Sequence, residues 1–406
     1  MRILHTSDWH LGQNFYGYDR SEEHHDFLVQ IRDIVAQELP DAMVVSGDIF
    51  HNYTPSLEAQ RLYTDSLIEI HNAAPKMEIF VTAGNHDSAS RLEVNNELWR
   101  LANVHIVGSL RHNEEGKIDF SQHLFKVGDK GYVVALPYIF NQQYPTDPEG
   151  VDNRRYFFEQ LNAFMEKNNV DGLPTVLMAH MAVRGSELKG QKIKGLTDIV
   201  GGIDFMPTEY FGKAFDYVAL GHIHHPQTIH GTTKRVRYSG SPIAVSFDED
   251  YEHSVTMVDV EHGVEPVINY NDFTIRNIRP LLTIPKEAQR TPLALDTLRK
   301  ETPTEGKYYI RFNPQERHIF PASMVEDVVQ ALDNINPEAK YATYVPNITK
   351  SNTGNVQKVE FTPEQLSTME PIDVAREFFS QIEEDFCDYE DLFKQVLERI
   401  DKEDAQ

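Results

Sequence analysis

One pattern recurs through the first 270 residues and limits what this chain can fold into. A short apolar run, rich in β-branched residues, is followed each time by a polar loop rich in Asp, His and Gly. Such runs occupy residues 2–6, 42–46, 78–82, 105–107, 132–136, 175–178, 217–220, 236–238 and 254–260. Helical spacing appears between several of them, as for Phe27, Ile31 and Val35. Alternating strands and helices predict a layered α/β core over residues 1–275.

A second unit begins near residue 276, and the length of 406 residues leaves room for it. Predicted strands and helices alternate here too; the strands cover residues 281–284, 308–312 and 340–345, and the helices 292–300 and 321–332. We therefore predict a small α+β domain at 276–349 and a polar linker at 350–370. Residues 371–406, here called the tail, contain two short amphipathic helices at 371–386 and 389–400.

Five short motifs stand where predicted strands end. They are Asp8-Trp9-His10, Gly47-Asp48, Gly84-Asn85-His86-Asp87, Ala179-His180 and Gly221-His222-Ile223-His224. In open α/β sheets, ligands bind beyond the carboxyl ends of the strands, so these loops are expected to meet in one place. A single Asp-x-His among 18 histidines is weak support for a metal site. Five such motifs, each after an apolar run, are much stronger support.

The residue types in these motifs predict two divalent cations. One site would be formed by Asp8, His10, Asp48 and His224, and the other by Asp48, Asn85, His180 and His222. Asp48 is predicted to bridge the ions, which would hold them ~3.5–4 Å apart. Carboxylate, amide and imidazole ligands without thiolate favour manganese or iron, allow zinc and disfavour calcium.

Such a site indicates hydrolysis of a phosphate ester, which also needs a proton donor for the leaving oxygen. We predict His86 as this acid, with Asp87 orienting its ring. The alternative for His86 is a structural hydrogen bond. His51, three residues after Asp48, is expected either to contact substrate or to be structural.

Composition bears on the partner and the compartment. The net charge of −25 lowers the expectation of nucleic-acid binding without excluding it, because residues 370–406, with 13 acidic and 4 basic residues, supply −9 of it. Three lysines after His180 (Lys189, Lys192 and Lys194, the lysine loop) are predicted either to follow a phosphate backbone or to form a solvated surface loop. A single cysteine excludes an internal disulfide. With no leader-like or membrane-spanning apolar segment, we expect a cytoplasmic protein that does not bind membranes.

The five motifs, in this order, resemble those of the calcineurin-like metallophosphoesterases. Their flanking residues narrow the resemblance to the SbcD family, the nuclease subunits of bacterial SbcCD DNA-repair complexes; these segments are residues 3–13, 46–51, 238–242 and 246–249. The resemblance implies a four-layer α-β-β-α core, a capping domain and a C-terminal helical pair. It also implies that all seven predicted ligands bind metal, that His86 is catalytic and that the metal is manganese. The implied activity is cleavage of double-stranded DNA from its ends and of single-stranded DNA internally.

The same resemblance implies partners. Members pair as nuclease dimers with two coiled-coil ATPase subunits of the SbcC type, in a heterotetramer on DNA, and the tail would contact the ATPase. The dimer helices would lie at about residues 57–71 and 91–101, although their apolar residues could instead face the sheet; the candidates are Leu62, Tyr63, Leu67, Leu98 and Trp99. The segment 185–192 lacks the Gly-Lys-[Ser/Thr] ending of a phosphate loop, so ATP hydrolysis is assigned to the partner.

Two other functions remain open from the sequence. A small-molecule or cyclic-nucleotide phosphodiesterase could use the same metals, but it would not need the ~130 residues after the core. A catalytically inactive scaffold would not need seven aligned ligands.

Overall fold

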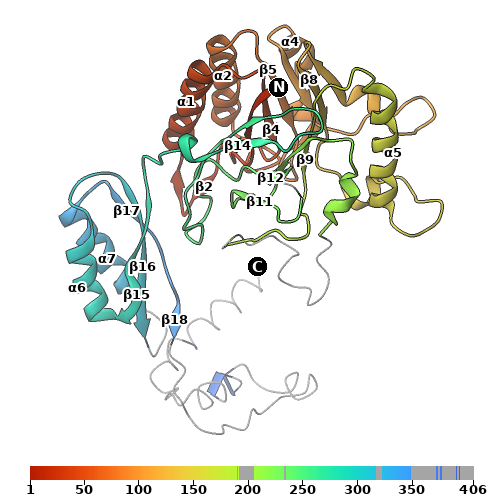
Figure 1. The fold of residues 1–406 in the computed structure, drawn as a ribbon. Coiled ribbons are helices and arrows are strands. Elements are labelled where there is room, and N and C mark those ends of the chain that lie inside the picture. Colours follow the sequence, from red (N-terminus) through yellow and green to blue (C-terminus); the bar gives the residue numbers. More distant parts are fainter. Residues whose placement is uncertain are drawn as a thin grey trace, which may run out of the picture.

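The computed structural model describes residues 1–189, 191, 205–232, 235–316 and 322–348, together with six single positions in the tail. Lys192, Lys194, the linker and almost all of the tail therefore lie outside the described residues. Two stacked sheets form the larger unit, and a third sheet forms a smaller unit beside it (Figure 1).

The first large sheet carries the three N-terminal motifs. Its order is β14-β13-β1-β4-β5-β6, namely Val267–Asn269, Thr256–Asp259, Arg2–Thr6, Ala42–Ser46, Glu78–Thr82 and Val104–Val107. Strands β1, β4, β5 and β6 are parallel, so their carboxyl ends share one edge. Helices α1 (Ser21–Glu38) and α2 (Leu57–Ala73) cover its outer face, and short helices α3 (Ala89–Leu92) and α4 (Asn96–Arg100) precede β6.

The second large sheet carries the other two motifs. Its order is β11-β12-β10-β9-β8-β7, namely Gln227–Thr228, Val236–Tyr238, Tyr217–Gly221, Thr175–His180, Gly131–Ala135 and Leu124–Val127. Strands β8, β9, β10 and β12 are parallel. Helix α5 (Asn153–Asn168) packs on the outer face through Phe157, Phe158 and Leu161. Short 3₁₀ turns occupy Phe120–Gln122, Asn141–Gln143, Thr208–Phe211 and Asn271–Phe273.

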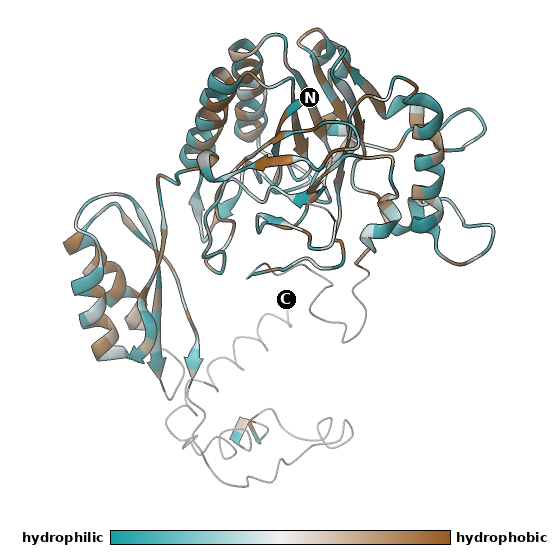
Figure 2. Cartoon of the chain, in the orientation of Figure 1, coloured by the Kyte–Doolittle hydropathy of each residue, from teal (hydrophilic) through white to brown (hydrophobic). Residues whose placement is uncertain are grey.

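Apolar side chains fill the space between the two sheets. Ile3 and Val44 of the first sheet lie in one buried cluster with Val176 and Tyr217 of the second. Two further clusters lie under the helices on either side. Strands are largely apolar and the helices alternate between apolar and polar faces (Figure 2). The predicted four-layer α-β-β-α core is confirmed, because helix, sheet, sheet and helix follow one another across the molecule.

The third sheet contains strands β15 (Leu281–Arg290), β16 (Tyr308–Glu316), β17 (Ala339–Tyr344) and β18 (Asn347–Ile348). Helices α6 (Thr291–Glu301) and α7 (Ala322–Ile335) pack on it around Leu298, Ile310 and Val328. This unit contacts the larger one through a hairpin that the sequence pattern missed, β2 (Asn14–Phe15) and β3 (Tyr18–Asp19). Phe15 of this hairpin packs with Tyr309 of β16. The domain boundaries predicted from the sequence stay predictions.

The side chains expected at a dimer interface divide into two groups. Tyr63 and Leu67 are buried in the core under the first sheet, so of the two alternatives the sheet-facing one holds for them. Leu62 and Trp99 pack against the same core. Leu98 is 64% exposed and stays a candidate.

Candidate metal centre

The five motif loops meet at the carboxyl ends of the two large sheets and bring their acidic and imidazole groups together. Asp8, His10 and His224 form one cluster, and Asp48, His180 and His222 form a second. Within each cluster the potential ligand atoms all lie within 4.8 Å of one another. Five of these six residues are buried, and His222 is half-buried. The chain is thus able to hold a cation at each of two adjacent points.

Asp48 lies between the two clusters. Its Oδ2 is 3.9 Å from Nε2 of His10 in one cluster and 3.3 Å from Nε2 of His180 in the other. Its Oδ1 accepts a hydrogen bond of 2.9 Å from the backbone N–H of His86. One carboxylate oxygen therefore faces both clusters while the other is fixed to the β5 loop.

Asn85 completes the second cluster. Its Oδ1 lies 3.1 Å from Nε2 of His180 and 2.9 Å from Nδ1 of His222. On the far side of its ring, Nδ1 of His180 lies 2.8 Å from the carbonyl of Ser46, which accepts its hydrogen bond. The Nε2 atom of His180 is therefore the one that faces the cluster.

The backbone at the predicted ligands is strained in a way that ordinary loops avoid. Asp8, His10, Asp48 and His222 all have positive φ, between 47° and 94°. Non-glycine residues rarely adopt this region, and such strain tends to gather at functional sites. Gly84 is required for a different reason: a Cβ there would lie 2.1 Å from Oδ1 of Asp48. The loops are thus shaped to bring their side chains inward.

Electrostatics favour a cation here. Burial lowers the pKa of His10 well below its usual value and that of His222 to about 3, so both imidazoles are neutral and have a free lone pair. Burial also opposes the charged form of His180, but the carboxylate of Asp48 outweighs it and raises the pKa to about 9. The buried carboxylates thus draw positive charge into the site.

Divalent ions fit these residues. The Nε2 atoms of His10 and His224 face each other at 3.2 Å, where two neutral imidazoles cannot both present a lone pair without a cation or proton between them. The donors are carboxylate, amide and imidazole, a set without thiolate that suits hard or borderline divalent metals.

Comparison with known proteins agrees with this chemistry. The sequence model of the calcineurin-like phosphoesterase family matches residues 1–226. The SbcD subunit of the SbcCD nuclease from Rhodobacter capsulatus is 36% identical over 281 residues, which cover 66% of this chain and 68% of that protein. Its counterpart from Bacillus subtilis is 34% identical, covering 65% and 68%, and that from Escherichia coli K12 is 32% identical, covering 63% and 65%.

The chain belongs to the SbcD family of calcineurin-like phosphoesterases. It is accordingly a hydrolase of the phosphodiesterase and nuclease class that uses divalent metal. The matched region spans about two thirds of the length of these relatives.

Two histidines outside the ligand clusters of this SbcD-family chain also face the site. The ring of His86 lies 5.2 Å from that of His10, and its Nδ1 is 2.9 Å from the backbone carbonyl of His51. The ring of His51 stacks on His86 at 5.9 Å and lies 5.3 Å from His10. Both predicted residues are therefore beside the first cluster, and the His51 carbonyl fixes the His86 ring with Nε2 left for other contacts.

The expectation for Asp87 is wrong. Its carboxylate does not contact the imidazole of His86; it accepts three backbone N–H groups, from Ile49 at 3.0 Å, Phe50 at 2.8 Å and Gly84 at 2.8 Å. A buried carboxylate is stabilised by such hydrogen bonds. Asp87 therefore ties the β4 loop, which carries Asp48, to the β5 loop, which carries Asn85.

Three residues near the ligands were not predicted from the sequence. Glu249 accepts a hydrogen bond of 2.9 Å from Nδ1 of His224. Gln191 donates to the carbonyl of His222 and accepts from the N–H of His224. The ring of Tyr138 lies 6.1 Å from His180. Only Glu249 had a signal, since it ends the segment 246–249 that resembles the family.

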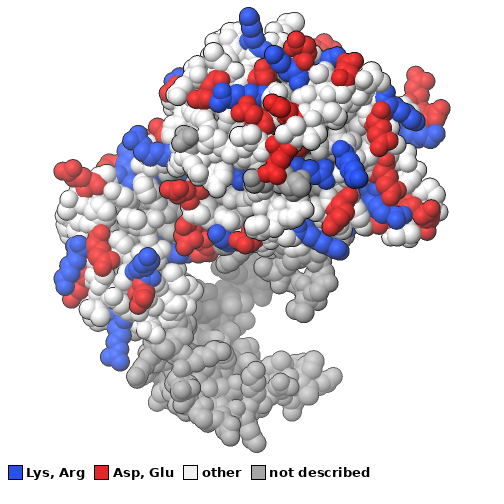
Figure 3. Space-filling view, in the orientation of Figure 1, with Lys and Arg blue, Asp and Glu red and all other residues white. Residues whose placement is uncertain are grey.

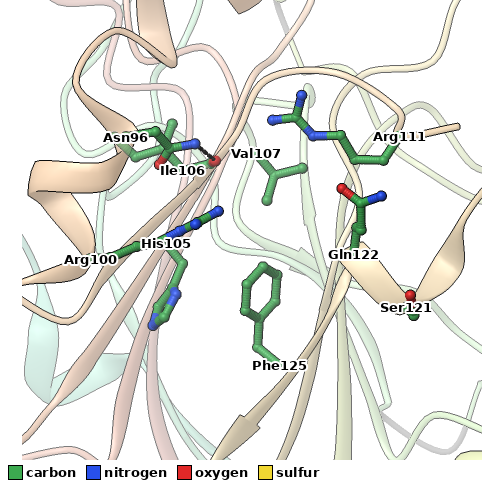
Figure 4. A pocket seen from close by; sticks show the side chains of 9 residues that line it. All are labelled: Asn96, Arg100, His105, Ile106, Val107, Arg111, Ser121, Gln122 and Phe125. Carbon is green, nitrogen blue, oxygen red and sulfur yellow. Dashed lines mark hydrogen bonds between the residues drawn. The ribbon is translucent and has the colours of Figure 1, made fainter. Parts of the chain in front are cut away.

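Other surface features lie away from the centre. A cavity of about 180 Å³ opens between β6 and the β7 edge (Figure 4). Its lining contains none of the predicted site residues; it consists of Asn96, Arg100, His105, Ile106, Val107, Arg111, Ser121, Gln122 and Phe125. Of the lysine loop, only Lys189 is described, and it is exposed.

Proposed function

We propose that this chain is the DNA-cleaving subunit of a repair nuclease, removing nucleotides from double-stranded ends, opening hairpins and cutting single strands internally in the cytoplasm. The observation that supports this most directly is the pair of ligand clusters sharing Asp48. The proposed ligand set is Asp8, His10, Asp48, Asn85, His180, His222 and His224, holding two divalent ions. Oxygen and imidazole donors favour Mn²⁺ among the available metals.

Such a pair of ions, when bound, polarises the phosphoryl group and lowers the pKa of water. The protein contributes positioning around it. Asp48 holds both clusters in register, and Asn85 supplies an amide oxygen beside His180. We assign His86 as the acid for the leaving oxygen, because its Nδ1 is fixed on the His51 carbonyl and its ring faces His10. His51 is assigned a substrate contact, since its ring lies beside that of His10 and stacks on that of His86.

The partners follow from the family. The relatives are named as SbcD subunits of the SbcCD nuclease, which supports a complex with a coiled-coil ATPase of the SbcC type. We propose a dimer of this chain with two ATPase subunits, with the tail as the ATPase contact. In the chain as described, no helix is long and apolar enough to cross a bilayer.

The test is cleavage by the full chain, alone and with a coiled-coil ATPase of the SbcC type. A linear blunt duplex, a single-stranded circle and a cyclic nucleotide are offered with Mn²⁺ and with EDTA. We expect both DNA substrates to be cut only with metal, and Asp48→Asn to cut neither. The matched control is Asp65→Asn, because Asp65 is an exposed carboxylate on α2; this variant should behave like wild type. Faster hydrolysis of the cyclic nucleotide than of either DNA would refute the proposal and favour the small-molecule alternative.

A further inference from the structure

Glu249 binds a predicted metal ligand from outside both clusters. Its Oε1 accepts a hydrogen bond of 2.9 Å from Nδ1 of His224 and its Oε2 accepts the N–H of Val245 at 3.0 Å. Glu249 as a whole residue is only 5% exposed. With Nδ1 donating to this carboxylate, His224 presents Nε2 toward His10. A carboxylate in this position fixes the tautomer and the orientation of a ligating imidazole.

Residues 244–249 form the loop that carries Glu249. The buried guanidinium of Arg20, in the larger unit, holds this loop by hydrogen bonds. This group donates to the carbonyl of Ala244 at 2.7 Å and to Oε1 of Gln13 at 2.6 Å. Gln13 in turn donates to the carbonyl of Val245 at 3.0 Å. Arg20 is completely buried, so these contacts are shielded from water.

The same loop is held from the other side by the small third sheet. Arg311 of β16 donates to Oδ1 of Asp248 at 2.6 Å, and its guanidinium lies 5.2 Å from the ring centre of Phe247. Phe247 is 7% exposed and lies 5.5 Å from Phe15, which also touches Tyr309 of β16. The loop therefore contacts both units, and these contacts are made by the residues that directly precede Glu249.

We propose that Glu249 is a positioning residue for His224 and that the seating of the third sheet on loop 244–249 sets the geometry of the first metal cluster through it. The inference rests on the proposed function, because it requires metal in that cluster. It assigns the small α+β unit a role at the metal centre in addition to any contact with DNA. Because Phe247, Asp248 and Glu249 are consecutive, a shift of the sheet at Arg311 displaces the carboxylate directly.

The experiment measures Mn²⁺ binding to the full chain by counting free ions in electron paramagnetic resonance spectra. Glu249→Gln should weaken one of the two sites by about 10–100-fold and leave the other unchanged. The signal of the spin-coupled ion pair should disappear at low Mn²⁺ and return at saturating Mn²⁺, together with turnover. Glu252→Gln, three positions along and exposed, is the matched control.

The second part of the experiment tests the contact from the third sheet. It uses Arg311→Ala, which substitutes no residue among the first 275. It should weaken the same site several-fold, and the double variant should match Glu249→Gln alone, because both changes act through one carboxylate. Arg299→Ala is the control, since that arginine pairs with Asp296 on α6 within the third unit. If Glu249→Gln does not fold, the Arg311 arm still decides.

The outcomes separate the two claims. A wild-type chain that binds no Mn²⁺ overturns the proposed function. A wild-type chain with two bound ions, together with an Arg311→Ala isotherm identical to wild type, overturns the coupling while the function stands. An unchanged isotherm for folded Glu249→Gln overturns the positioning role of Glu249.

Discussion

Replacing Asp87 by Asn separates a structural carboxylate from a catalytic one. Burial, together with the charge of Asp48, raises the pKa of Asp87 to about 6, so at pH 8 it is ionised and accepts at both oxygens. Oδ2 accepts two N–H groups, from Ile49 and Gly84, and Oδ1 accepts one, from Phe50. If the asparagine oxygen takes the place of Oδ2, it keeps the hydrogen bonds from Ile49 and Gly84. Its NH₂ group then faces the N–H of Phe50, and two donors cannot form a hydrogen bond with each other.

The cost of that substitution can be worked from these contacts. One buried hydrogen bond to a charged group is lost and one buried N–H is left unpaired, which costs about 1.5–3 kcal/mol. At about 2–4 °C per kcal/mol for domains of this kind, the unfolding midpoint should fall by about 3–12 °C. Asp87→Ala removes both acceptor oxygens, and with them all three hydrogen bonds, and should cost at least about 3 kcal/mol.

Thermal unfolding at pH 8 and metal analysis together provide the assay. Because Asp87 joins the loops of Asp48 and Asn85, metal affinity should fall along with stability. Asp65→Asn again serves as the control, because that carboxylate is exposed. The reasoning is refuted if Asp87→Asn unfolds at the wild-type temperature with both ions bound and only the turnover number falls, since that result would assign Asp87 to His86 and the chemistry.

Four further predictions concern the acid, the dimer, the DNA and the ATPase. His86→Ala should abolish cleavage yet retain both ions by elemental analysis; loss of one ion would make His86 a ligand. Leu98→Glu should yield a folded monomer by sedimentation velocity, because this side chain is 64% exposed, whereas an unfolded product would place it in the core. Changing the three lysines of the lysine loop to Glu should lower the salt slope of DNA binding by roughly 0.9 per lost phosphate contact, and an unchanged slope would reject that role. Deleting residues 371–400 should leave a metal-loaded core that still cuts single strands but no longer co-purifies with the ATPase; undiminished ATPase binding would contradict the tail assignment.

The sequence predicted that the side chains of the five motifs would meet, because strand ends determine where these side chains lie. An apolar run of five residues followed by Asp or His can be recognised without knowing the fold, and parallel strands bring all such ends to one edge. Residues 2–6, 42–46 and 78–82 therefore agree with β1, β4 and β5, and the side chains that follow them meet as expected.

The sequence failed where a role depends on which backbone groups lie nearby. Asp87 stands next to His86 along the chain, yet its carboxylate is directed toward N–H groups 37 and 38 residues earlier. Tyr63 and Leu67 have helical spacing that suits either a core or an interface, and only packing decided between them. The two-residue strands β2 and β3 are too short to give a periodic signal, although Phe15 joins the two units through them.

The acidity of the chain becomes compatible with a DNA substrate once its distribution is considered. Residues 370–406 supply −9 of the total −25, and none of the five motifs lies among them. On the face shown, acidic and basic side chains of the described residues are interspersed (Figure 3). At the centre, the buried carboxylates of Asp8 and Asp48 would repel a phosphate, whereas divalent cations bound among them would reverse the local sign. The metal-loaded state would therefore be the one that attracts the phosphate of the proposed substrate, so metal binding and substrate binding at this centre would be coupled by charge before any chemistry begins.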